Sequence, residues 1–227
     1  MSELAQRYNQ ISEQVAAAAA AHGRSASDIT LVVVTKNHPP QLVFDLISLG
    51  ARDFGENRDQ EAAPKAKEVL DASPEAMRWH FIGQLQTNKV RSVLDYADLI
   101  HSLDRESLLS ELQKRTADRA KPLGVFIQVN LTEDPERGGV RVQDLEGFAT
   151  KVLSSQGLRL EGLMGVGGLD KDPAVEFERL AGLSTKLQAL APEAKGLSMG
   201  MSSDFEVAIG YGATHLRIGT AITGKRP

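Results

Sequence analysis

A lysine closely follows the first apolar run of the chain, Ile29 to Val34, and its type and place suit covalent chemistry. Side chains of an extended strand alternate between two faces, so Lys36 shares a face with Val32 and Val34. If that face lines the inside of a closed sheet, the amine points into the mouth of the barrel. A lysine amine in such a place can attack an aldehyde and form a Schiff base.

Small residues, hydroxyls and an arginine follow the last two apolar runs of the chain. The sequence there reads GMSSD (200–204) and RIGT (217–220). Gly219 lets a ligand approach the backbone, and the hydroxyls of Ser202 and Thr220 can donate hydrogen bonds to an oxyanion. We expect a phosphate monoester to bind here, because loops after the last two strands of a barrel are a common phosphate site.

Together the two features point to a phosphorylated aldehyde, and pyridoxal 5′-phosphate (PLP) carries both groups. Each feature alone has a simpler explanation. A lysine at a strand end is most often a solvated charge, and SMGMSSD alone could be a turn between a strand and a helix. Ser203 can either join the phosphate site or cap the helix that follows it, beside Asp204. The combination makes PLP the cofactor that we expect.

These residues need a scaffold that brings the ends of distant strands together. After an alanine-rich helix from Ser2 to about His22, short apolar runs alternate with helical stretches. The runs predicted as strands are ITLVVV (29–34), ARDFGEN (51–57), WHFIG (79–83), ADLIHSL (97–103), LGVFIQVN (123–130), LRLEGLMGVG (158–167), LSMGM (197–201) and THLRIG (214–219). Eight strand-and-helix units predict an α/β fold, a single parallel (β/α)8 TIM barrel. The rival is an open doubly wound sheet, which would carry a glycine-rich turn where this chain has VVVTKNHPP.

The composition excludes several classes of function. The chain has 227 residues and no cysteine, which rules out disulfides, thiolate nucleophiles and cysteine-ligated metal. A formal net charge of -4 gives no surplus of positive charge for nucleic acid. No stretch approaches the roughly 20 apolar residues of a membrane span. We expect one cytoplasmic, monomeric domain, 1–227, in which residues 1–23 form a helix packed on the barrel.

Five collinear motifs resemble the pyridoxal phosphate homeostasis proteins of the YggS/PROSC type. They are VVVTK (32–36), FGEN (54–57), WHFIGQLQTNK (79–89), SMGMSSDFEVAI (198–209) and RIGTAITG (217–224). The resemblance runs from about residue 30 to 224. It implies a barrel of the alanine-racemase N-terminal domain type that carries PLP as a Schiff base on Lys36. Members of this family are regarded as carriers or buffers of the cofactor in vitamin B6 homeostasis, with no established turnover.

The same resemblance implies the other site residues. Ser202, Gly219 and Thr220 would hold the phosphate. Arg217 would lie by the phosphate and ring side of the cofactor, and Asn57 would line the pocket. No residue is assigned to catalysis or to a metal.

Amino-acid turnover on PLP needs acid–base groups besides the lysine. If Arg217 faces the ring nitrogen, that nitrogen stays unprotonated and is a weak electron sink. A racemase could still work with a tyrosine opposite the lysine. The tyrosines Tyr8, Tyr96 and Tyr211, however, map to the outside or the opposite end of the barrel. His38 is the one other candidate near the mouth.

Three functions stay open. The first is a PLP carrier without chemistry of its own, which hands the cofactor to apo-enzymes. The second is a racemase-type enzyme, and the third is a phosphosugar aldolase or isomerase in which Lys36 forms a transient imine with the substrate. We favour the first.

The remaining charged and histidine residues are interpreted as structural. His80 and His215 are expected to be hydrogen-bonded interior residues, whereas His22 and His101 are expected to be structural or exposed. The charged stretch from Asp59 to Glu68 is interpreted as a solvated helix face.

Overall fold

The strands of the protein close into a parallel barrel. The computed structural model describes residues 2–73, 77–132, 134, 137–167 and 172–224. Its strands are Thr30–Val34 (β1), Asp53–Glu56 (β2), Arg78–Phe81 (β3), Leu99–Leu103 (β4), Leu123–Asn130 (β5), Val140–Arg141 (β6), Leu158–Met164 (β7), Gly196–Ser198 (β8) and His215–Ile218 (β9). The parallel order is β4-β3-β2-β1-β9-β8-β7-β5, and pairing of β4 with β5 closes the ring. The predicted eight-stranded barrel is confirmed, while the short β6, which pairs with β5 outside the ring, was not expected.

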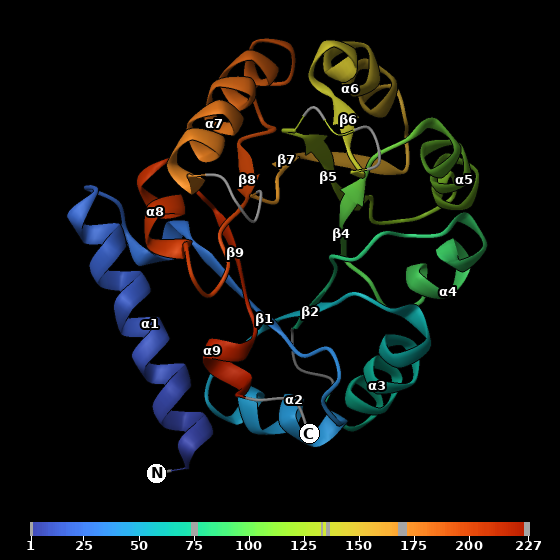
Figure 1. Ribbon diagram of the computed structural model, residues 1–227. Helices are drawn as coiled ribbons and strands as arrows, with labels where there is room; N and C mark the ends of the chain where they lie inside the picture. The colour runs from blue at the N-terminus through green and yellow to red at the C-terminus, as the bar shows by residue number, and fades with distance from the viewer. Residues whose placement is uncertain (1, 74–76, 133, 135–136, 168–171, 225–227) are drawn as a thin grey trace.

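Helices surround the barrel on all sides (Figure 1). They are Glu3–Ala21 (α1), Pro40–Ser48 (α2), Asp59–Ala72 (α3), Val90–Leu94 (α4), Glu106–Thr116 (α5), Leu145–Leu153 (α6), Pro173–Leu190 (α7), Phe205–Gly210 (α8) and Thr220–Thr223 (α9). Short 3-10 helices span Ala26–Asp28, Thr87–Lys89 and Val142–Asp144. Within the described residues, no helix is both long and apolar enough to cross a membrane.

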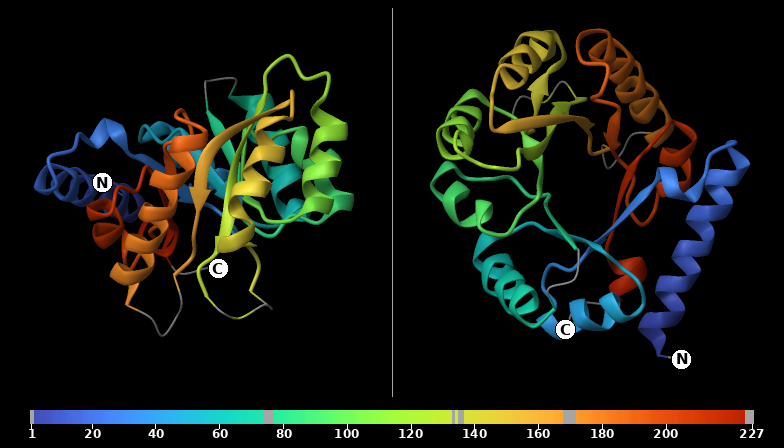
Figure 2. Two further views of the ribbon diagram at one scale, coloured as in Figure 1. Left: turned by 90° about the horizontal axis from the view of Figure 1, so that it is seen from above. Right: turned by 180° about the vertical axis from the view of Figure 1, so that it is seen from behind.

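Helix α1 packs where the helices of the barrel itself are short. Helices α8 and α9 have 6 and 4 residues, and α1 lies beside both of them in the ribbon views (Figures 1 and 2). The Arg7 side chain on α1 donates to the Ile222 carbonyl of α9 at 2.8 Å, and Arg24 after α1 donates to the Ile209 carbonyl of α8 at 3.0 Å. These bonds take up backbone carbonyls at the ends of the two short helices, so α1 completes the outer layer there.

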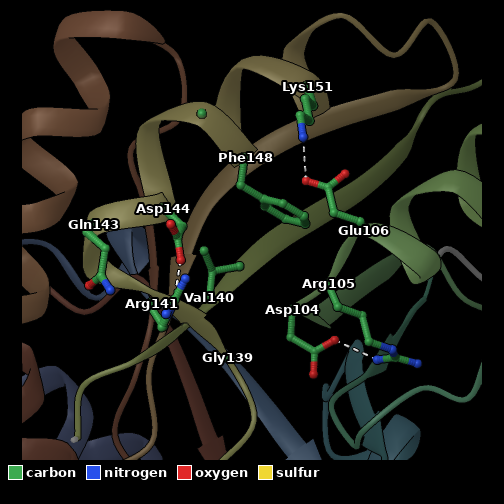
Figure 3. Close-up of a pocket in the computed structure, with 11 residues that line it drawn as sticks. Asp104, Arg105, Glu106, Gly139, Val140, Arg141, Gln143, Asp144, Phe148 and Lys151 are labelled. Atoms are coloured by element: carbon green, nitrogen blue, oxygen red, sulfur yellow. Dashed lines mark hydrogen bonds and ion pairs between the residues drawn. The ribbon is translucent and has the colours of Figure 1, made fainter. Parts of the chain in front are cut away.

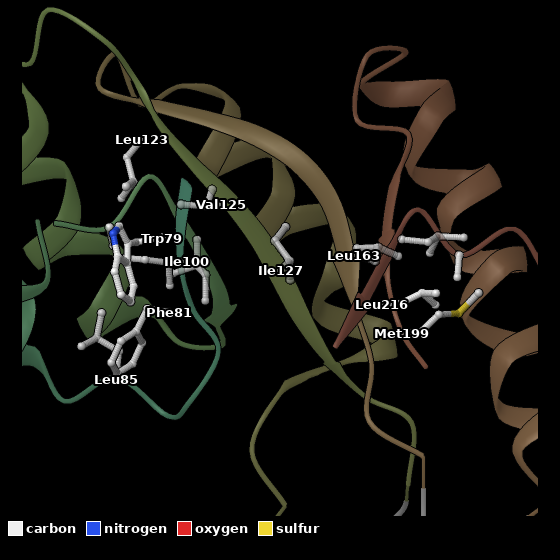
Figure 4. Close-up of a cluster of buried hydrophobic side chains, with 14 of the residues drawn as sticks. Trp79, Phe81, Leu85, Ile100, Leu123, Val125, Ile127, Leu163, Met199 and Leu216 are labelled. Carbon is white, nitrogen blue, oxygen red and sulfur yellow. The ribbon is translucent and has the colours of Figure 1, made fainter. Parts of the chain in front are cut away.

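The main hydrophobic core lies between the barrel and the helices. Trp79, Phe81 and Ile127 belong to this outer cluster (Figure 4). A separate small cluster of Leu99, Phe126 and Met164 lies inside the barrel. Because side chains alternate along a strand, every barrel strand serves both layers.

The first strand shows this alternation and aims its end at the barrel mouth. Val33 belongs to the outer cluster, whereas Val32 and Val34 do not. A Cβ at Gly55 would lie 3.0 Å from one methyl of Val32 and 3.4 Å from one of Val34, so both valines face the inside beside β2. The first strand therefore has the predicted inner face, which extends as far as Val34. The turn that carries Lys36 follows directly.

Helix α3 corrects one expectation. The stretch from Asp59 to Glu68 was expected to be a solvated face, but Asp59 is 8% exposed and Lys65 is 4% exposed. Both are buried although neighbours such as Lys67 and Glu68 are exposed. The interpretation was wrong at these two positions, because a helix that packs on a barrel turns only part of its polar residues to water.

Candidate functional site

The six residues predicted for the site lie at the carboxyl ends of four neighbouring strands. The strand order β2-β1-β9-β8 makes these ends one continuous arc of the rim. In that order the residues are Asn57 after β2, Lys36 after β1, Arg217, Gly219 and Thr220 at the end of β9, and Ser202 after β8. The rim at the carboxyl ends of the strands is where barrels of this type place their sites.

The loops after β8 and β9 form a group of backbone donors. The Ser202 hydroxyl accepts a hydrogen bond from the Ala221 N–H at 3.5 Å, which links the two loops. Among the described residues, no hydrogen bond takes up the backbone N–H groups of Ser202, Ser203, Gly219 or Thr220. Free N–H groups that converge from two loops suit an anion.

Gly200 shapes the first of these loops. Its φ is +91°, and a Cβ there would lie 2.7 Å from Cβ of Ala208. Only glycine adopts this conformation without strain and lets α8 approach so closely. The backbone carbonyl of Gly200 also accepts a hydrogen bond from the Arg217 N–H at 3.0 Å, which ties the loop after β8 to β9.

The end of β1 lies against the loop after β9. Val33 is in register with Ile218, and a Cβ at Gly219 would lie 3.5 Å from Cβ of Val34. Lys36 follows two residues later and is partly exposed. Within the part of the chain that the structure describes, no hydrogen bond or ion pair holds the Lys36 amine. The amine is therefore available to a ligand beside the free N–H groups.

Asn57 offers an unsatisfied acceptor on the other side of Lys36. Its Oδ1 is buried and has no hydrogen-bond partner among the described residues. Gly83 packs on its backbone, since a Cβ there would lie 2.2 Å from the Asn57 carbonyl oxygen. Asn57 also lines a pocket of about 250 Å³ with Gln84, Gln86 and Lys89, all from the WHFIGQLQTNK motif.

Arg217 is buried at the floor of the arc. It is 6% exposed, and its guanidinium donates to the Ser198 hydroxyl at 2.6 Å and to the Gly165 carbonyl at 2.9 Å. Burial lowers its pKa to about 10, with a smaller opposing effect from Asp204. Arg217 therefore stays a cation at neutral pH and can only donate hydrogen bonds.

A chain of hydrogen bonds continues from Arg217 through the inside of the barrel. His101 Nδ1 lies 2.7 Å from Ser198 Oγ, His101 Nε2 lies 2.9 Å from His80 Nδ1, and His80 Nε2 lies 2.8 Å from Asp53 Oδ1. Because Arg217 donates to Ser198, the serine hydrogen is free to point to His101. His101 can then donate to His80, and His80 to the Asp53 carboxylate.

Two histidines of the barrel interior, His101 and His215, are held neutral by their surroundings. Burial lowers the pKa of His101 well below its usual range, and the neighbouring His80, His215 and Arg217 act in the same direction. Burial likewise lowers the pKa of His215 to about 3. His80 and His215 lie inside the barrel, as expected. His101 is fully buried and structural, so the alternative of an exposed residue is wrong. Within the described residues, no histidine or acidic cluster could hold a metal ion.

The tyrosines lie in the outer layer. Tyr96 packs edge-on to Trp79 with ring centroids 6.4 Å apart, and Tyr8 and Tyr211 pack against the same outer cluster. This agrees with their expected positions away from the barrel mouth. His38 lies two residues past Lys36 and is partly exposed, and its N–H donates to the Thr35 carbonyl at 3.2 Å.

A larger cavity of about 590 Å³ lies between α5 and α6, away from the predicted residues. Figure 3 shows that its charged residues pair within the cavity. The pairs are Asp104 with Arg105 at 2.6 Å, Arg141 with Asp144 at 2.6 Å, and Lys151 with Glu106 at 2.7 Å. Since each cation is already neutralised, this cavity has no surplus positive charge for a phosphate.

Comparisons with known proteins agree with this architecture. The sequence model of the family described as "Alanine racemase, N-terminal domain" matches residues 7–227. The pyridoxal phosphate homeostasis protein of Escherichia coli (strain K12) is 36% identical over 233 residues, which cover 100% of this chain and 98% of that protein. The protein of the same name from Pseudomonas aeruginosa is 37% identical, with 100% and 97% covered.

A solved structure is similar over the whole chain. PipY of Synechococcus elongatus PCC7942, determined with PLP bound, superposes with a TM-score of 0.85 at 30% identity, covering 98% of this chain and 100% of that chain. The chain therefore belongs to the alanine racemase N-terminal domain family and, within it, to the pyridoxal phosphate homeostasis proteins.

Proposed function

We propose that this protein binds PLP covalently on Lys36 and serves in PLP homeostasis as a carrier of the cofactor. The observation that carries the proposal is the pairing of the Lys36 amine, which has no partner among the described residues, with free backbone N–H groups at the end of the adjacent strand. The named relatives and the PLP-bound PipY support the choice of ligand.

The residues present fit this cofactor. When bound, PLP supplies an aldehyde, whose carbon bonds to a lysine nitrogen with release of one water, and a phosphate, which needs several donors. The free N–H groups of Ser202, Gly219 and Thr220 are donors of this kind. The buried Asn57 Oδ1 has no donor among the described residues, and a ring substituent with a hydrogen would supply one.

Each residue then has a separate task. Ser202, Gly219 and Thr220 bind the phosphate through backbone and hydroxyl donors, Lys36 provides the nitrogen, and Asn57 lines the pocket. Arg217 carries a full charge and is anchored from below by Ser198 and Gly165, so it presents a rigid cation to the phosphate and ring side of the ligand.

The same residues favour a carrier over an amino-acid racemase. Arg217 has no acceptor atom, so it cannot hold a proton on a ring nitrogen as a carboxylate would. All three tyrosines pack in the outer layer, which leaves no tyrosine to act as a second base at the mouth. His38 is the remaining candidate for a second base. The measurement of Cα hydrogen exchange described below tests this possibility.

The test compares Lys36→Ala with Lys67→Ala, a matched control because Lys67 is an exposed lysine on the outer helix α3. We expect the wild-type protein and the control to absorb visible light after PLP is added, and borohydride to fix a pyridoxyl group on the peptide that contains residue 36. Lys36→Ala should stay colourless and folded. Colour that persists in Lys36→Ala, or a label on another peptide, would refute the assignment.

Two further measurements separate the alternatives. Sustained exchange of the Cα hydrogen of supplied amino acids at enzymatic rates would establish the racemase-type function. Labelling of Lys36 only when a sugar phosphate is present, with no colour from PLP, would establish the aldolase-type function. We expect neither.

We extend the proposal to the setting of the carrier. The chain acts as one PLP-binding domain, 1–227, because residues of α1 share one hydrophobic cluster with the barrel strands. We further propose that it works as a cytoplasmic monomer, binds neither nucleic acid nor membrane, and hands PLP to apo-enzymes. Light scattering and PLP transfer to an apo-enzyme test the monomer and the transfer.

A further inference from the structure

Lys36 lies in a tight turn directly after β1. Residues 36 and 37 are the centre of this turn, which the hydrogen bond from the His38 N–H to the Thr35 carbonyl closes at 3.2 Å. Asn37 has φ +62°, a left-handed conformation that asparagine tolerates better than most residues. The position of the Lys36 amine therefore depends on how firmly this turn is held.

A buried ionic cluster on α3 and β2 holds the turn from behind. Lys65 Nζ donates to the Thr35 carbonyl at 2.8 Å, to Glu56 Oε1 at 2.7 Å and to Glu61 Oε1 at 3.0 Å. An ammonium has three hydrogens, so all of them are used. We call Glu56, Glu61 and Lys65 the Lys65 clasp. The side chains of Lys65 and Glu56 are 3% and 0% exposed.

The clasp reaches the residues on both sides of Lys36. On the preceding side, the Thr35 hydroxyl donates to Glu56 Oε1 at 2.7 Å, and the backbone N–H of Thr35 donates to the Gly55 carbonyl at 3.0 Å. On the following side, the Asn37 N–H donates to the Glu61 carboxylate. Each neighbour of Lys36 is thus bonded to a carboxylate that is itself bonded to Lys65.

Burial of the Lys65 and Glu56 charges costs desolvation free energy that apolar side chains would not. Desolvation raises the pKa of Glu56, although Lys65 and Thr35 oppose this, and its Oε2 has no partner among the described residues. Apolar side chains of similar volume would stabilise the same contact between helix and barrel at least as well. What they could not supply is directional bonding to the backbone of residues 35 and 37.

We propose that Lys65 is a positioning residue for Lys36: through the clasp it fixes the turn after β1, so that the Lys36 amine is presented to the aldehyde of the ligand. This inference rests on the proposed function of Lys36. It predicts that breaking the clasp harms formation of the covalent bond far more than it harms binding of the phosphate.

The first test uses the protein without ligand. We expect Lys65→Met to speed amide hydrogen exchange at Asn37 and His38 at least tenfold, while amides of β5, on the far side of the barrel, keep their rates. Lys67→Met is the matched control, because Lys67 is exposed on the same helix and, within the part of the chain that is described, pairs only with Asp71. Unchanged exchange at the turn in Lys65→Met would overturn the proposal whatever Lys36 does chemically.

The second test compares two ligands. PLP can bond to Lys36, whereas pyridoxine 5′-phosphate has the same ring and phosphate but an alcohol in place of the aldehyde. We expect Lys65→Met to slow formation of the borohydride-trapped product at Lys36 at least tenfold, and to change the affinity for pyridoxine 5′-phosphate less than threefold. Equal losses for both ligands in a folded variant would show a merely structural role and overturn the proposal.

Two milder changes keep the test decisive if Lys65→Met does not fold. Glu61→Gln keeps the size of a side chain that is 28% exposed but removes its charge, and the double variant Glu56→Gln, Lys65→Met leaves no buried charge unpaired. Each should show the same divergence between the two ligands. If borohydride trapped PLP on another residue than Lys36 in the wild-type protein, the proposed function would be refuted. The amide hydrogen exchange experiment would still test whether the clasp holds the turn.

Discussion

Acidification should destabilise the barrel through the histidines of its interior. Burial holds the pKa of His215 at about 3 and the pKa of His101 well below its usual range. The unfolded chain returns both groups to a pKa of about 6.5 and binds protons that the folded chain refuses. The free energy of unfolding therefore has its full value above about pH 6.5 and decreases as the pH falls toward the pKa values of the folded state.

The size of the effect follows from the pKa of His215. Between roughly pH 7 and pH 5, a group with a pKa of about 6.5 unfolded and about 3 folded lowers the free energy of unfolding by about 2 kcal/mol. His101 contributes a loss of the same sign. A loss of at least about 2 kcal/mol is a large part of the stability of a typical domain, so it is readily measured.

Urea unfolding at several pH values measures this loss. Trp79 is the single tryptophan of the chain and is 1% exposed, so its fluorescence reports the unfolding of the barrel. We expect His215→Gln to reduce the slope of the free energy of unfolding against pH by up to about 1.4 kcal/mol per pH unit. His22→Gln, at an exposed position after α1, is the matched control. Equal free energies of unfolding at neutral and acidic pH in the wild-type protein would refute the reasoning.

Three further substitutions probe the site. Ser202→Ala should weaken PLP binding by about 1 kcal/mol or more in an absorbance titration, because hydrogen bonds to charged acceptors contribute roughly 1.5 to 3 kcal/mol. An unchanged affinity would show that the phosphate binds elsewhere. Arg217→Lys should lower the free energy of unfolding by about 2 kcal/mol, because an ammonium cannot keep both bonds to Ser198 and Gly165. Urea unfolding identical to that of the wild-type protein would contradict this. Gly83→Ala should destabilise by roughly 1 to 3 kcal/mol, because its Cβ would lie 2.2 Å from the Asn57 carbonyl oxygen; a neutral thermal melt would count against that packing.

The barrel could be predicted because each strand leaves a strong local signal. LGVFIQVN is eight residues long, rich in branched and aromatic residues, and its predicted range coincides with β5. Helix α1 was equally clear, with Ser2 accepting from the Ala5 N–H at 3.2 Å at its start. The two-residue β6 leaves no such pattern, because two residues show no alternation.

The partners of buried polar residues could not be predicted in the same way. His101 and Ser198 are bonded although 97 positions separate them, and only the register of distant strands brings them together. Lys65 shows the same limit. In the sequence it is one more charge on a polar helix, and its burial depends on which face of α3 meets the turn after β1. The rim positions of Lys36 and Arg217 were predictable because strand ends are local features and the fold aligns them.

The most direct test of the account is a crystal structure of this protein grown with PLP. We expect continuous density from Lys36 Nζ to the aldehyde carbon of the ligand, with the phosphate on the backbone N–H groups of Ser202, Gly219 and Thr220. A phosphate bound in another part of the molecule, or a Lys36 side chain turned into bulk solvent beside bound PLP, would contradict it.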